Sequence, residues 1–120
     1  MNGGIASDGW DSSQVQVVWK MADAINPAPA NLFVFTDTSA ESIATGHFGD
    51  PGDALNPAAF AWTVVPATYH NRAGALSFAD GHAEVHRWKD PRTWSPNAAF
   101  SPSPNNRDIL WILEHMTGRK

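Results

Sequence analysis

The stretch ALSFADGHAEVHRW (75–88) carries the clearest structural signal in the chain. Asp80-Gly81 separates two short runs of β-forming residues, and glycine tolerates the positive φ that a two-residue hairpin turn requires. A turn of that length places Leu76 opposite Val85 on the neighbouring strand. The sequence therefore predicts a β-hairpin whose apolar face carries four side chains: Leu76, Phe78, Ala83 and Val85.

The same turn puts polar side chains on the other face of the hairpin. His82, Glu84 and His86 alternate along the second strand, so an H-x-E-x-H row of potential zinc ligands points to one side. A strand holds the two histidines too far apart for one ion to reach both easily. A solvated sheet face is therefore the favoured interpretation, with zinc as the alternative.

Shorter signals lie upstream of the hairpin. Alternating residues predict a strand at 14–19, and dense apolar runs predict strands at 31–37 and 61–65. Residues 39–44 favour a short helix. Because strands are not alternating regularly with long helices, we expect an antiparallel sheet with short helices and long loops.

A helix is predicted at 108–117, where Asn106 is a suitable N-cap and apolar residues recur at helical spacing: Ile109, Ile112, Leu113 and Met116. Residues 89–106 are rich in proline and serine, so we expect an irregular connection there. Together these signals predict one α+β domain spanning 1–120.

Composition limits the function. The chain has 120 residues, a net charge of −4, and no basic stripe, which disfavours a nucleic-acid partner. It has no cysteine, so thiol nucleophiles, thiolate zinc sites and disulfides are excluded. No apolar run is long enough to cross a bilayer, and we expect the chain as given to be soluble. Six Trp and six Phe supply a large apolar area from few positions.

One motif links the hairpin to a known family. His70 is followed by nine residues and then Asp80-Gly81, within PATYHNRAGALSFADGHAEVHRWKDPRTW (66–94). This pattern resembles the prepilin-type processing-associated H-X9-DG family of pseudopilin-like bacterial proteins. Two further stretches are similar to the family: NLFVFTDTSAESIATGHF (31–48) and DILW (108–111).

The resemblance implies a pilin-like fold and a role as a structural or assembly module in a type II secretion or type IV pilus-like system. Family members begin with an apolar helix that this sequence lacks, so the chain corresponds to the globular C-terminal domain. Its expected partners are other pilin or pseudopilin subunits, or a second copy of itself. The implied location is periplasmic or cell-surface, with membrane attachment only through the absent helix.

Calcium is the cofactor that this resemblance suggests. Calcium takes oxygen ligands, and Asp37, Glu41 and Asp80 are candidates, with backbone carbonyls completing the site. Asp50 and Asp53 flank a Gly-Pro loop and form a second possible pair. Solvated loop carboxylates are the alternative interpretation of all five.

A small metal-dependent esterase or lactonase is the alternative function. The hairpin prediction places His70 beside Asp80 and His82, where the three could polarise a water molecule. Turn formation explains Asp80-Gly81 equally well. Three tryptophans outside the predicted helix are further candidates, for core packing or for partner or carbohydrate contact: Trp10, Trp62 and Trp94.

Overall fold

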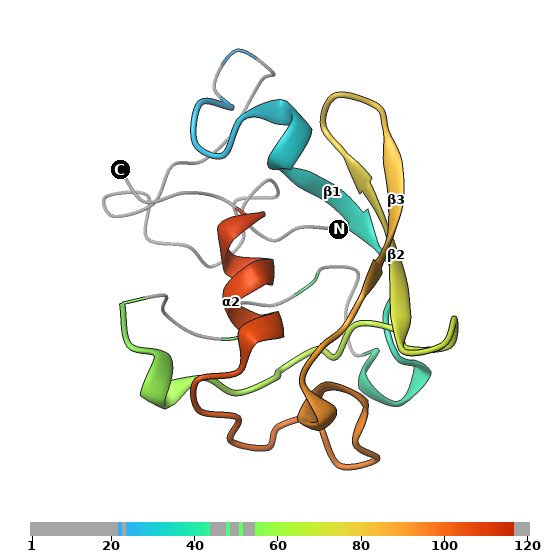
Figure 1. Ribbon diagram of the computed structural model, residues 1–120, viewed down its shortest axis with the longest axis vertical. Coiled ribbons are helices and arrows are strands. Elements are labelled where there is room, and N and C mark those ends of the chain that lie inside the picture. Colours follow the sequence, from blue (N-terminus) through green and yellow to red (C-terminus); the bar gives the residue numbers. More distant parts are fainter. Residues whose placement is uncertain (1–21, 23, 44–47, 49–50, 52–54, 117–120) are drawn as a thin grey trace.

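A computed structural model describes residues 22, 24–43, 48, 51 and 55–116 of the chain. Its sheet has three antiparallel strands in the order β1-β2-β3: β1 (Phe33–Thr36), β2 (Ala73–Phe78) and β3 (Ala83–Arg87). The helix α2 (Arg107–Glu114) stands across from the sheet, and single turns of 3₁₀ helix lie in the loops (Figure 1). The predicted α+β class is therefore confirmed.

The hairpin turns where the sequence predicts, but its loop has three residues instead of two. Ser77 pairs with Ala83, Leu76 with Glu84, and the Phe78 N–H donates to the His82 carbonyl at 2.9 Å. Gly81 adopts a φ of 95°. A three-residue loop that ends in a left-handed glycine is a common hairpin closure, and Asp-Gly suits it as well as the two-residue turn.

This one-residue difference overturns the predicted faces of β3, because a slip of one residue sends every side chain to the opposite side. Leu76 and Phe78 are buried as expected, but Val85 is 65% exposed. Ala83 is exposed too. Glu84, opposite Leu76, shares the inner side of the sheet with the two other polar residues of the H-x-E-x-H row.

The core lies between the inner face of the sheet and α2. Phe33, Leu76 and Phe78 belong to one buried cluster with the α2 residues Ile109 and Ile112. This helix was predicted at 108–117 from the helical spacing of its apolar residues, and the structure confirms it, although it ends at Glu114. The Asn106 side chain caps it as expected and accepts hydrogen bonds from the N–H groups of two residues in the first turn: Asp108 and Ile109.

One upstream prediction is wrong. Residues 61–65 form no strand: Ala61 makes only an isolated bridge with Pro102, and the Val65 N–H donates to the Ser42 hydroxyl instead of to a neighbouring strand. The short helix predicted at 39–44 is a single 3₁₀ turn, Ala40–Ser42. The predicted strand at 14–19 lies outside the described residues.

Candidate functional site

His70 and Asp80 lie at opposite ends of β2. His70 sits in the exposed turn before the strand, where the Arg72 N–H donates to the Thr68 carbonyl at 3.1 Å. Asp80 follows the strand in the hairpin loop. A six-residue strand rises about 3.3 Å per residue, so these side chains are separated by on the order of 17 Å. The prediction that the His70 imidazole lies beside the hairpin turn is therefore wrong.

Asp80 and His82 do come together. The Asp80 carboxylate accepts the His82 backbone N–H at 3.1 Å and contacts the His82 Nδ1 at 2.5 Å. These hydrogen bonds lower the pKa of Asp80 below 3.8. The imidazole also stacks on Phe78, with ring centroids 4.4 Å apart. Both side chains are partly exposed, and the pair closes the hairpin loop.

Asp37 is a structural residue. Its Oδ1 accepts the Ala75 N–H at 2.9 Å, and its own N–H donates to the Ala75 carbonyl at 3.2 Å. The carboxylate joins the end of β1 to β2 at Gly74, where a Cβ would lie 3.0 Å from the same Oδ1 and 2.9 Å from the Ala67 carbonyl oxygen. Glycine is needed there because the chain leaves no room for a side chain.

The structure does not assemble the predicted calcium ligands. Asp37 lies beside Gly74 and Ala75 near the start of β2, whereas Asp80 follows its far end. Glu41 is exposed on the 3₁₀ turn at 40–42. Within the described ranges, no three His, Asp or Glu residues are grouped so that they could hold an ion. Asp50 and Asp53 lie outside those ranges.

The H-x-E-x-H row contributes to packing. The His86 ring stacks on Trp111 of α2 at 3.7 Å, and His115 stacks on the same indole at 3.9 Å. His115 Nδ1 donates to the Trp111 carbonyl at 2.7 Å. Burial lowers the pKa of His86 below 6.5. The remaining residues of the row are His82 and Glu84, and the His82 Nε2 lies 3.9 Å from a Glu84 carboxylate oxygen.

Asp108 is a key residue that the sequence interpretation missed. Its carboxylate is 1% exposed and accepts the backbone N–H groups of Lys89 and Asp90 and the hydroxyl of Thr93. It thus fastens the irregular 89–93 segment to the start of α2. A signal was present, because Asp108 precedes the buried Ile112 by four residues and so lies on the buried side of the helix.

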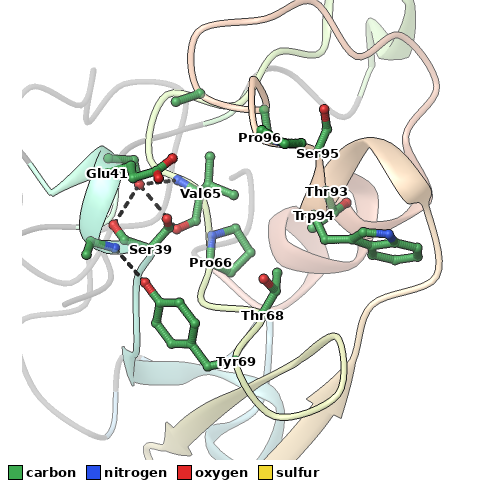
Figure 2. A pocket seen from close by; sticks show the side chains of 14 residues that line it. Ser39, Glu41, Val65, Pro66, Thr68, Tyr69, Thr93, Trp94, Ser95 and Pro96 are labelled. Carbon is green, nitrogen blue, oxygen red and sulfur yellow. Dashed lines mark hydrogen bonds between the residues drawn. The ribbon is translucent and has the colours of Figure 1, made fainter.

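A cavity of about 250 Å³ lies between residues 39–42, 65–69 and 93–99 (Figure 2). The Tyr69 hydroxyl accepts the Ala40 N–H at 2.8 Å across one wall, and Ser42 Oγ accepts the Val65 N–H at 3.0 Å. Of the predicted calcium ligands, only Glu41 lines this cavity. The other lining residues carry mainly hydroxyl-bearing or apolar side chains. Neither Asp80 nor His82 lines this cavity.

The three tryptophans that the sequence offered as candidates are Trp10, Trp62 and Trp94, and the structure describes two of them. Trp62 is fully buried in the core, which confirms packing as its role. Trp94 is half-buried at the cavity, and the Arg72 guanidinium lies 4.8 Å from the centre of its ring. Trp10 lies outside the described residues.

Comparisons with protein-family models, with curated proteins and with solved structures find no match to this chain. Of the helices in the described ranges, none has the length and apolar character needed to cross a membrane.

Proposed function

We propose that this chain is the globular domain of a pseudopilin-like subunit, a structural module of a type II secretion or type IV pilus-like assembly. The H-X9-DG resemblance suggests this class, and a periplasmic or cell-surface location follows from it. The observation that carries the proposal is an exposed, mostly apolar surface on the side of the sheet away from α2, with Arg87 at one end. This surface, here called the outer face, is made of five residues: Phe35, Ala75, Ser77, Ala83 and Val85.

The pairing of the strands builds this outer face. Phe35 pairs with Ser77, which pairs with Ala83, and Ala75 pairs with Val85 in the next row. The two large side chains, Phe35 and Val85, are 58% and 65% exposed, with only small residues between them. Exposed apolar side chains that lie side by side on one face are typical of a protein contact site.

The opposite face of the sheet is already occupied by the core. Phe33 on β1 and Ile109 on α2 are both fully buried in the cluster that covers this side. A neighbouring subunit can therefore reach the sheet through the outer face. We propose that this face packs against another pilin or pseudopilin subunit.

Site-specific photocrosslinking in cells that produce the protein tests this function. A photoreactive phenylalanine analogue at position 35 is expected to capture subunits of a secretion or pilus assembly. The matched control places the analogue at position 100, because Phe100 is 75% exposed outside the sheet. Equal capture from both positions, or capture from position 35 of proteins unconnected with any such assembly, would contradict the proposal.

The Asp80–His82 contact supports a second candidate, a small metal-dependent ester or lactone hydrolase. An imidazole held by a carboxylate can accept a proton from water, and the pair is open to solvent. This function predicts that Asp80→Asn abolishes hydrolysis of activated esters and lactones. His70→Ala should leave that hydrolysis intact because His70 lies beyond the other end of β2. No hydrolysis by the unmodified protein, with or without added zinc or calcium, would reject this candidate.

A further inference from the structure

We propose that the free edge of β3, which pairs with no other strand among the described residues, pairs with the same edge of a second copy of the chain. The two β3 strands run antiparallel about a two-fold axis at Val85, and two three-stranded sheets become one continuous sheet. This contact concerns the chain's own second copy. It is independent of the proposed function and would hold for any role of the domain.

The backbone of β3 is arranged for such pairing. At one end of the hairpin the Phe78 N–H donates to the His82 carbonyl, and at the other the Trp88 N–H donates to the Arg72 carbonyl. Bonded and non-bonded pairs alternate along an antiparallel ladder. The N–H and C=O groups of three residues of β3 therefore point away from β2, toward the open edge: Ala83, Val85 and Arg87.

The edge is also accessible and regular. Four of the five residues of β3 are exposed, and only His86 is half-buried. Its pairing with β2 runs without a bulge, whereas β1 on the other side of the sheet has a register shift between Phe33 and Phe35. Bulges protect an edge from pairing, and a regular exposed strand is a template for another strand. Figure 1 shows β3 beside β2 at the edge of the sheet.

Charge and strand length together select the register. With the axis at Val85, Glu84 of each copy lies opposite His86 of the other, so no two like charges face each other. With the axis at Glu84, two carboxylates face each other, and like charges directly opposite destabilise a pair. With the axis at His86, two imidazoles face each other and Ala83 has no partner. The Val85 axis alone pairs all five residues of the strand.

The expected dimer is weak, because five paired residues bury less surface than a stable interface needs. Two Val85 side chains meet on the outer face, and their contact adds a small apolar area to the backbone hydrogen bonds. We therefore expect a reversible monomer–dimer equilibrium that shifts with protein concentration.

A single engineered cysteine tests the geometry, because the chain has no cysteine of its own. In Val85→Cys, the two Cα atoms across the axis would lie about 5.5 Å apart, within the range of a disulfide. Mild oxidation of this variant is expected to give a covalent dimer. Ser77→Cys is the matched control, since this residue shares the outer face but lies on the central strand. Cross-linking of both variants at the same rate would overturn the proposal.

Sedimentation over a range of concentrations tests the contact without a cross-link. The unmodified chain is expected to dimerise and Val85→Pro to stay monomeric, because proline removes the outward N–H while the ladder to β2 keeps its hydrogen bonds. Val85→Thr, which keeps both the N–H and the β-branched shape, should dimerise. A monomeric unmodified chain, or equal dimerisation of a folded Val85→Pro variant, would refute the pairing. Should Val85→Pro fail to fold, the cysteine comparison decides.

Discussion

Asp108 shows how one side chain can join two distant segments. Its buried carboxylate accepts three donors from residues 89, 90 and 93, so an apolar or neutral replacement leaves buried donors without a charged acceptor. We expect Asp108→Ala to lower the free energy of unfolding by about 3 kcal/mol, as measured by urea denaturation.

Asp90→Ala is the control for this measurement. The Asp90 carboxylate also receives several hydrogen bonds, but all of them come from the neighbouring Arg92; the Asp90 side chain is 13% exposed and that of Arg92 is 45% exposed. Because solvent screens this pair in part, we expect its loss to cost on the order of 1 kcal/mol. A loss at Asp108 no larger than the loss at Asp90 would show that the buried network does not stabilise the fold.

His86 makes stability depend on pH. Burial lowers its pKa in the folded state below 6.5. The negative charges of Asp108 and Glu84 act in the opposite direction and raise this pKa, whereas the charges of His115 and Lys89 lower it further. The unfolded chain then binds more protons than the folded chain, so stability rises with pH. The contribution is complete above 6.5 and is lost as the pH falls from there through the folded pKa.

We therefore expect His86→Phe, which keeps an aromatic ring beside Trp111, to weaken the decline of the melting temperature below pH 6.5. The control is His70→Phe, because His70 is exposed in a turn. If the melting temperature falls equally steeply below pH 6.5 in the unmodified chain and in His86→Phe, that result would count against burial of this imidazole.

At the scale of elements, local signals predicted the existence of the hairpin and of α2 but not the details of their packing. The spacing of Ile109 and Ile112 and the cap at Asn106 are properties of neighbouring residues, and the structure confirms them. Local sequence could not predict the register of the hairpin, because Asp80-Gly81 is compatible with a loop of two or of three residues. Side-chain packing beyond the turn, such as His82 on Phe78, accompanies the longer loop.

Nuclear Overhauser effects measure this register directly. In the three-residue loop, Ser77 and Ala83 form a non-hydrogen-bonded pair, whose Hα atoms lie close together. We expect a strong Hα–Hα cross-peak between them and another between Ala75 and Val85. A two-residue turn would instead give the cross-peak between Leu76 and Val85, and that result would refute both the outer face and the β3 edge.

At the scale of the whole molecule, the candidate site was the part that sequence could predict least. The nine-residue spacing from His70 to Asp80 contains the whole of β2, which holds the two side chains apart. Helical spacing could place Asp108 on the buried side of α2, but it could not identify the donors of Asp37 or Asp108, because these lie 38 and 15–19 residues away in the chain. Such contacts depend on the folded path of the loops, which no local pattern encodes.

The outer face is the feature on which the proposed function depends, and Phe35→Asp in cells tests it most directly. The side chain is 58% exposed, so we expect the purified variant to keep the melting temperature of the unmodified domain. Secretion or pilus assembly should fail in cells that carry it and persist with Phe100→Asp, a substitution at a similarly exposed phenylalanine. Normal secretion or pilus assembly in cells that carry a stably folded Phe35→Asp variant would contradict the proposed role of the outer face.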